Sequence, residues 1–79
     1  MRVSVHLHAD LARLAPDDAR QGRVVFDLPT GAVVGDVLAR LEVPRHRRVV
    51  IGLNGEAAAL TAALNDGDRI DLVAPMSGG

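Results

Sequence analysis

The chain has 79 residues, enough for one small domain, and it lacks cysteine, which excludes disulfides, thiolate metal sites and cysteine nucleophiles. Its formal net charge of −1 and its single aromatic residue, Phe26, argue against nucleic-acid binding, which uses basic surfaces and stacking platforms. No apolar run is long enough to span a membrane and no signal segment opens the chain, so we expect a cytoplasmic protein that binds neither nucleic acid nor membrane.

The first part of the chain predicts two strands. Residues Arg2 to Ala9 alternate strictly, with Val3, Val5, Leu7 and Ala9 on one face and Ser4, His6 and His8 on the other. This pattern is typical of a half-buried strand. Asp10 to Gly22 contains Pro16 and is expected to be a loop with one helical turn. Arg23 to Leu28 alternates again, with Val24, Phe26 and Leu28 inward, and predicts the hairpin partner of the first strand.

The period then changes to that of a helix. Val34, Val37, Leu38 and Leu41 recur at positions i, i+3, i+4 and i+7, which places them along one helical stripe. Pro44 is expected to end this helix, because the residue before a proline is disfavoured in the α region.

The rest of the chain predicts a strand, two turns and a last strand. Val49 to Leu53 is an apolar, β-branched run and is expected to be a strand covered on both faces. Asn54-Gly55 is typical of a type I′ hairpin turn. Glu56 to Ala63 is ambiguous between a short strand and a helical turn, and Asn65-Asp66-Gly67-Asp68 predicts a second turn. Arg69 to Ala74 alternates as the final strand.

This order of elements favours an α+β fold, with a mixed sheet of four to five strands and one main helix packed on one face. The helix stripe and the inward strand faces would form a single core: Val3, Val5, Leu7, Val24, Phe26, Leu28, Ile51, Leu53, Ile70 and Leu72. If the final strand lies centrally, its end projects from the domain. We therefore expect a domain over residues 1–74 and a flexible arm over residues 75–79.

The sequence ends in Met76-Ser77-Gly78-Gly79, and a terminal carboxylate here would be the reactive group. The carboxylate is ionised at neutral pH, since its ordinary pKa is about 3.5. It can attack the α-phosphate of ATP and form an acyl-adenylate, from which a sulfur nucleophile displaces AMP. Glycines lack a Cβ and allow the chain to enter a narrow site close to a nucleotide.

The sequence resembles the ubiquitin-like sulfur carriers, which include the small subunit of molybdopterin synthase (MoaD) and the thiazole-forming carrier of thiamine synthesis (ThiS). The resemblance rests on the order and spacing of several segments: Phe26-Asp27-Leu28-Pro29, Val33 to Leu41, Leu53-Asn54-Gly55-Glu56, Leu64 to Ile70 and Pro75 to Gly79. It implies the β-grasp fold, which agrees with the element order.

The resemblance also implies a mechanism in which the chain is a protein co-substrate and not an enzyme. An E1-like enzyme would adenylate Gly79 with ATP, and a persulfide or sulfide donor would convert it to a thiocarboxylate. This group would deliver sulfur to a synthase subunit. Gly78 would give clearance, and Pro75, Met76 and Ser77 would enter partner sites. No bound cofactor or metal is implied.

Two positions depart from the family pattern. Val33 stands where a Thr or Ser usually caps the helix, so we expect its start to depend on packing and on Asp36 near the positive end of the helix dipole. Glu42 stands where a glycine often ends the helix, which would leave the stop to Pro44.

Other charged residues carry weaker hypotheses. Arg45, Arg47 and Arg48 flank His46 in a basic cluster that could dock an acidic partner surface. His6 and His8 share a strand face, but two imidazoles with a distant His46 fall short of a zinc site. Asp66-Gly67-Asp68 lacks the ligand spacing of a calcium loop, so we expect a turn.

The acceptor of the sulfur stays open. Pro75 and the length of the chain favour a role like that of the molybdopterin synthase small subunit. The alternatives are a carrier for thiamine thiazole, cysteine or sulfur-containing natural products, a ubiquitin-like protein modifier joined through Gly79, or an interaction module with an inert tail.

Overall fold

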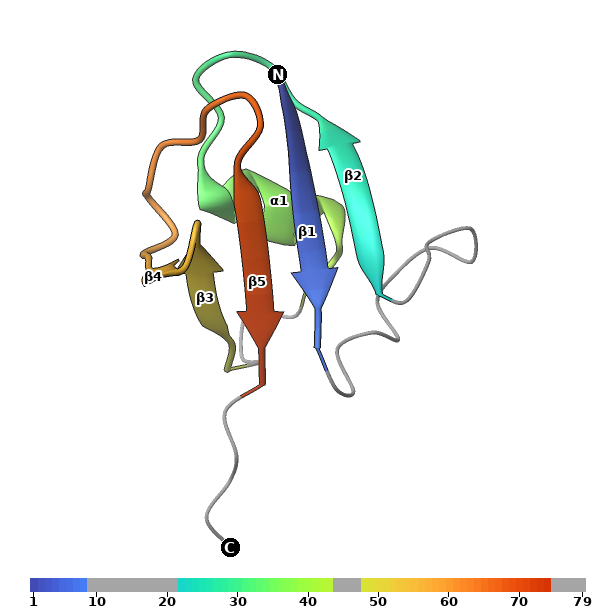
Figure 1. Cartoon of the computed structure of the whole chain (residues 1–79), viewed down its shortest axis with the longest axis vertical. Helices are drawn as coiled ribbons and strands as arrows, with labels where there is room; N and C mark the ends of the chain where they lie inside the picture. Colours follow the sequence, from blue (N-terminus) through green and yellow to red (C-terminus); the bar gives the residue numbers. More distant parts are fainter. Residues whose placement is uncertain (9–21, 44–47, 75–79) are drawn as a thin grey trace, which may run out of the picture.

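The computed structural model describes residues 1–8, 22–43 and 48–74, and in these ranges it forms one sheet and one helix (Figure 1). The strands are β1 (Arg2–Leu7), β2 (Arg23–Asp27), β3 (Val50–Leu53), β4 (Glu56–Ala57) and β5 (Arg69–Val73), and the helix is α1 (Val34–Arg40). Their order along the chain is the one predicted. The stretch 56–63, ambiguous in the sequence, forms the two-residue strand β4 and then a loop. The loop with one helical turn expected over Asp10 to Gly22 lies outside the described residues, except for Gly22.

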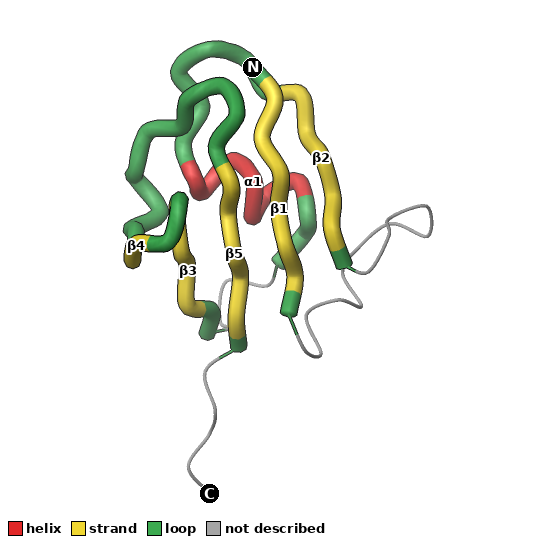
Figure 2. Tube along the Cα trace, viewed as in Figure 1, coloured by secondary structure: helices red, strands yellow, loops and turns green. Residues whose placement is uncertain are grey.

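The five strands lie in the order β2-β1-β5-β3-β4. β1 and β5 are parallel at the centre, and the other neighbours are antiparallel. The helix α1 lies across one face of the sheet, as Figures 1 and 2 show. This is the mixed sheet with one covering helix that the sequence predicts, and the last strand is central.

The core lies between α1 and the sheet. Val3, Val5, Val34, Val37, Ile70 and Leu72 are its largest fully buried side chains. Leu38, Phe26 and Leu53 are on the predicted side but are only partly buried, packed against the margin of this cluster. The sequence pattern therefore predicts correctly which side chains face the core. These three side chains at the edge of the core are less buried than expected.

The prediction that Val49 to Leu53 is covered on both faces is wrong. Val50 is 52% exposed, and only Ile51 is fully part of the core. The helix covers one face, and no other described element packs on the outer face of the sheet (Figure 1). A β-branched apolar run therefore does not show that both of its faces are buried.

The helix ends before Pro44, and the predicted stop at that proline is wrong. Glu42 has φ 58°, in the left-handed region. The Glu42 N–H donates to the Ala39 carbonyl and the Val43 N–H to the Leu38 carbonyl, each at 3.1 Å. These two bonds make a Schellman motif, which ends the helix with a glutamate at the position that glycine usually occupies. Pro44 itself lies outside the described residues.

The start of the helix confirms the role expected for Asp36. Its Oδ2 accepts a hydrogen bond from the Val33 N–H at 2.8 Å. The N–H groups of Val34 and Gly35 donate to the carbonyls of Ala62 and Leu60 at 3.0 and 2.8 Å. The carbonyls of the loop after β4 thus accept hydrogen bonds from N–H groups of the first helical turn, which have no partner within the helix. This contact joins segments distant in sequence, so the local sequence does not predict it.

Both predicted turns are present. Asn54 and Gly55 have φ values of 52° and 89°, as a type I′ turn requires, and they join β3 to β4. The turn at 65–68 contains Gly67 with φ 86°. Among the described residues there is no helix long and apolar enough to cross a membrane.

Candidate functional site

Strand β5 fixes the position of Ala74, the last described residue and the point from which the predicted arm would start. Ile70 and Leu72 are fully buried, and Leu72 pairs with Leu7 on one side and Ile51 on the other. The His8 N–H donates to the Leu72 carbonyl at 3.1 Å. Since a strand bonded on both sides is held firmly, the chain reaches Ala74 at a defined point on the sheet.

The residues assigned to the arm lie outside the described residues: Pro75, Met76, Ser77, Gly78 and Gly79. Their roles therefore stay predictions, as does the division into a domain and an arm.

The predicted docking cluster is only partly described. Arg45 and Arg47 lie outside the described residues, whereas Arg48 is exposed just before β3. An exposed Arg48 is available for contact, and docking of an acidic partner surface by this cluster stays a prediction.

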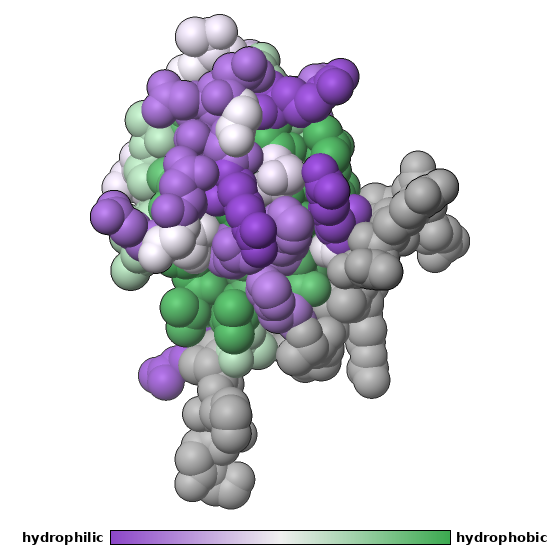
Figure 3. Space-filling view, viewed as in Figure 1, coloured by the Kyte–Doolittle hydropathy of each residue, from purple (hydrophilic) through white to green (hydrophobic). Residues whose placement is uncertain are grey.

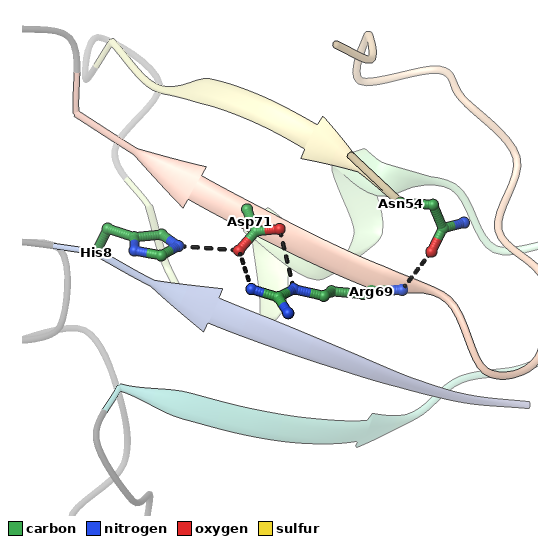
Figure 4. Close-up of polar contacts among 4 residues, drawn as sticks. All are labelled: His8, Asn54, Arg69 and Asp71. Atoms are coloured by element: carbon green, nitrogen blue, oxygen red, sulfur yellow. Dashed lines mark hydrogen bonds and ion pairs between the residues drawn. The ribbon is translucent and has the colours of Figure 1, made fainter. Parts of the chain in front are cut away.

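A turn network fixes the opposite end of β5. The Asp68 carboxylate, which is buried, accepts hydrogen bonds from the Asn65 N–H at 2.7 Å and from the Asn54 amide at 2.9 Å. The Asn54 side-chain oxygen accepts from the Arg69 N–H at 3.0 Å (Figure 4). Asp66 accepts from the Arg2 N–H at 2.7 Å. Both turn carboxylates thus bond to protein N–H groups, as expected for a structural turn.

Three side chains form an ionic cluster on the outer face of the sheet, which we call the β5 cluster: His8, Arg69 and Asp71 (Figure 4). The Asp71 carboxylate accepts two bonds from the Arg69 guanidinium, each at 3.1 Å, and lies 2.9 Å from His8 Nε2. Partial burial raises the pKa of Asp71, but the bonds from Arg69 and His8 together outweigh it and lower that pKa below 3.8. Asp71 is therefore a satisfied carboxylate and not a proton acceptor at neutral pH.

His6 lies beside this cluster, because it pairs with Asp71 in the parallel register of β1 and β5. Partial burial, followed by the charge of Arg69, lowers the pKa of His6 below its ordinary 6.5. Within residues 1–8, 22–43 and 48–74, no three His, Asp or Glu side chains gather as metal ligands. His46, the third histidine, lies outside these ranges.

An apolar pair lies on the same outer face, close to the end of β5. Val50 and Val73 are cross-strand partners and are 52% and 40% exposed. Figure 3, which looks onto this face, shows apolar surface gathered at the end of the sheet where β5 stops, next to a polar region. Sequence reasoning gave this pair no role, although Val73 alternates outward with Arg69 and Asp71. That alternation was the available signal.

The described residues contain four kinds of feature. These are a buried apolar core, the β5 cluster, structural turns, and a small apolar pair near the end of β5. They offer no nucleophile paired with a base and no set of metal ligands.

Comparison with known proteins gives a match over nearly the whole chain. The model of the ThiS family matches residues 5–79. Among solved structures, SAMP1 from Haloferax volcanii is 31% identical, with a TM-score of 0.79 and 100% of each chain covered.

Two further structures are similar. The small archaeal modifier protein 1 from H. volcanii is 29% identical, with a TM-score of 0.77, and 95% of this chain and 98% of that chain are covered. A Pyrococcus furiosus protein, provisionally named as molybdopterin converting factor subunit 1, is 25% identical with the same coverages and a TM-score of 0.76. These matches confirm the resemblance and the β-grasp fold.

Proposed function

We propose, since the chain belongs to the ThiS family, that it is a sulfur carrier whose Gly79 is the site of modification. The observation that carries this proposal is the family match, which extends through Gly79 and includes the diglycine end. The central position of β5 supports it, because a strand bonded on both sides gives the arm a firm base.

The proposed chemistry begins at the carboxylate of Gly79. One of its oxygens attacks the α-phosphorus of ATP in an E1-like enzyme, pyrophosphate leaves and an acyl-adenylate forms. Hydrosulfide then attacks the carbonyl carbon and AMP leaves, which gives the thiocarboxylate. With a persulfide donor, the terminal sulfur of the persulfide attacks the carbonyl carbon and AMP leaves, which gives an acyl disulfide. A second thiol then attacks the donor's own sulfur, so that the thiocarboxylate is released and a disulfide between donor and thiol remains.

The other arm residues position this group. Gly78 lets the chain pass through a narrow channel, because it adds no side chain. Pro75 and Met76 supply apolar contacts and, with Ser77, occupy the entrance of the partner's site. The carrier contributes neither acid nor base, so we propose that it acts as a co-substrate and that its partners are the catalysts.

The sulfur acceptor is proposed to be a synthase subunit, as in molybdopterin formation. Support comes from the similarity to the P. furiosus protein, whose name makes it one subunit of a molybdopterin converting factor. The alternatives are transfer of sulfur to thiamine thiazole, to cysteine or to other sulfur-containing products, and all of them use the same thiocarboxylate. Incubating the loaded carrier with each acceptor enzyme, and measuring which one forms product, distinguishes these alternatives.

The test is reconstitution with the adenylating enzyme of the source organism. We expect ATP–pyrophosphate exchange that depends on the carrier, and, with added sulfide, a carrier mass raised by the replacement of one oxygen with sulfur. A full-length carrier that supports no exchange with any adenylating enzyme of its organism would contradict the proposal and favour an interaction module with an inert tail.

A second candidate function is protein modification. It is favoured by the similarity to SAMP1 and to the small archaeal modifier protein 1. Gly79 would then be joined to lysine amines of target proteins. Because the chain has no lysine, chains of this modifier could grow only from its N-terminal amine. Isopeptide adducts in cell extract, absent when Gly79 is deleted, would support this function.

A further inference from the structure

We propose that β2 is a self-association edge, at which two copies of this chain pair their β2 strands antiparallel and form one continuous sheet. The two-fold axis of the pair passes beside Val25. The occupant of the edge is therefore a second copy of the chain. The inference goes beyond the proposed sulfur chemistry, because it concerns a strand that does not lead to the arm.

The first argument is the position of β2 in the sheet. Among the described residues β2 has β1 as its one neighbour, and it lies at the outside of the sheet (Figure 1). Its five residues pair with β1 in an unbroken register. The strand contains no proline, bulge or inward-pointing charge, which are common devices against edge-to-edge pairing. The opposite edge strand, β4, has only two residues and offers little backbone to a partner.

The second argument is the direction of the backbone groups. The Met1 ammonium donates to the Leu28 carbonyl and the Leu28 N–H donates to the Met1 carbonyl, both at 2.8 Å. Bonded and non-bonded pairs alternate along an antiparallel ladder, so the even-numbered residues of β2 bond to β1. The N–H and carbonyl groups of Arg23, Val25 and Asp27 therefore point away from β1, toward the open edge.

The third argument is charge complementarity. An axis beside Val25 places Val25 opposite its own copy and each Arg23 opposite Asp27 of the other copy. The three outward backbone positions then face each other, and both ends of the pair join opposite charges. A register shifted by two residues leaves either both arginines or both aspartates without a charged partner. A shift of four residues places like charges opposite each other.

The contact between Arg2 and Asp27 leaves room for this pairing. Arg2 Nε lies 3.4 Å from Asp27 Oδ1, and the two side chains are 71% and 79% exposed. An ionised carboxylate has two oxygens and accepts several hydrogen bonds. Asp27 can therefore keep its contact with Arg2 and add Arg23 of the second copy.

The apolar side chains of β2 fit the same register. Val24 lies opposite Phe26 of the second copy, on the side of the sheet that faces the core, and cross-strand pairs of an aromatic and a β-branched residue are stabilising. Phe26 is the single aromatic residue of the chain and is only partly buried at the edge of the core. Val25, which is 49% exposed, meets its own copy on the outer face. The pairing thus covers apolar surface that one copy leaves exposed.

The dimer leaves β5 accessible in each copy, because β1 lies between β2 and β5. Since the two β2 strands run antiparallel, the two β5 strands also run in opposite directions. Their Ala74 ends therefore lie at opposite ends of the continuous sheet. A pair of five-residue strands is small against the roughly 1,200 Å² of a stable interface, so we expect a weak dimer that depends on protein concentration.

The test is sedimentation velocity of the full chain at rising concentration and low ionic strength. We expect the unaltered protein to pass from one copy to two at concentrations up to about 1 mM. Arg23→Asp and Asp27→Arg each place like charges opposite each other at both ends of the pair. Each should raise the dissociation constant by roughly tenfold or more. Arg48→Asp is the matched control, because it makes the same change of charge at an exposed arginine before β3, and it should leave the association unchanged.

An equimolar mixture of Arg23→Asp and Asp27→Arg is the sharpest measurement. One variant carries two acidic residues on β2 and the other carries two basic residues, so a mixed pair again joins opposite charges at both ends. We expect the mixture to associate at least as tightly as the unaltered protein, although neither variant does so alone. A general loss of structure in the variants would not produce this rescue.

Three results would overturn the inference. The first is an unaltered chain that stays single up to about 1 mM, which would leave the edge to a strand of a different protein. The second is a mixture that associates no better than its two components. The third is an equal loss of association in Arg48→Asp. Should a β2 variant not fold, as judged by circular dichroism, amide exchange of the unaltered protein decides. The N–H groups of Arg23, Val25 and Asp27 must gain protection as the concentration rises, and protection gained only elsewhere overturns the inference.

Discussion

At the scale of single residues, Glu42 is held in a conformation that side chains ordinarily avoid. Its φ of 58° ends the helix through the Schellman bonds of Glu42 and Val43. A residue with a Cβ in this region costs about 1–2 kcal/mol relative to right-handed conformations. The surrounding bonds keep it there, since they satisfy carbonyls of the last helical turn.

We therefore predict that Glu42→Gly raises the free energy of unfolding by ~0.5–1 kcal/mol, because glycine adopts the left-handed conformation without strain. Urea unfolding followed by circular dichroism measures this change. Glu42→Ala is the control, since it removes the charge but keeps the Cβ, and it should gain little. A loss of stability in the glycine variant would mean that the glutamate side chain itself stabilises this end.

The second residue-scale prediction concerns pH. The folded pKa of His6 lies below its ordinary 6.5, so the unfolded chain binds more protons between the two values. This contribution to stability is complete above pH 6.5 and is lost as the pH falls through the folded pKa. Asp71 acts in the same direction below pH 3.8, where its lowered pKa makes the folded state resist protonation.

We expect the unfolding free energy to decrease from pH 7 toward pH 5, and His6→Gln to flatten that slope. Unfolding curves at several pH values measure it, with Ser4→Ala as the control, because Ser4 lies on the same strand face and does not titrate. A slope that is unchanged in His6→Gln would assign the pH dependence to other groups.

At the scale of elements, two turns act as one unit. The Asp68 carboxylate joins the turn at 65–68 to Asn54 of the hairpin turn, and Asn54 in turn binds the first residue of β5. These turns are far apart in sequence but adjacent at one end of the sheet. The Asn and Asp side chains of these turns therefore bond to a distant segment as well as shape the turn itself.

We predict that Asp68→Ala lowers the free energy of unfolding by about 1–3 kcal/mol, because it leaves partly buried Asn65 and Asn54 donors without their acceptor. Asp66→Ala is the matched control in the same turn. Its bond to the Arg2 N–H is exposed, so water can replace the lost acceptor and the cost should be smaller. Equal losses in both variants would contradict the buried network. Chemical denaturation of the two variants decides between these results.

At the scale of the whole molecule, stability and the proposed chemistry are separable. The core lies between α1 and the sheet, whereas the proposed reactive group follows Ala74 by five residues. Deletion of Gly79 should therefore abolish adenylation and leave the thermal midpoint nearly unchanged, since terminal residues contribute little burial.

Pyrophosphate exchange and thermal unfolding of the same preparation measure the two effects of this deletion. Leu72→Ala is the reverse control, because it should lower stability by about 2–5 kcal/mol while it leaves the arm intact. A chain without Gly79 that still supports exchange at the unaltered rate would contradict the carrier mechanism.

The sequence by itself determined the elements and their order. Three local patterns predicted their elements correctly: the period-two alternation in β1 and β5, the period-3.6 spacing in α1, and the Asn54-Gly55 dipeptide. They did so because backbone preferences act over only a few residues. The ordered motifs through Gly79 likewise identified the family.

Only the tertiary structure decided which surfaces are covered and which polar groups meet. The exposure of Val50, the bonds from α1 to the loop carbonyls of Leu60 and Ala62, and the His8–Asp71 contact all join segments distant in sequence. An apolar run indicates that both faces of a strand could be buried. Whether they are buried depends on how many other elements pack against the sheet. In the part of the chain that the structure describes, one helix covers one face, and Val25, Val50 and Val73 stay about half exposed on the other.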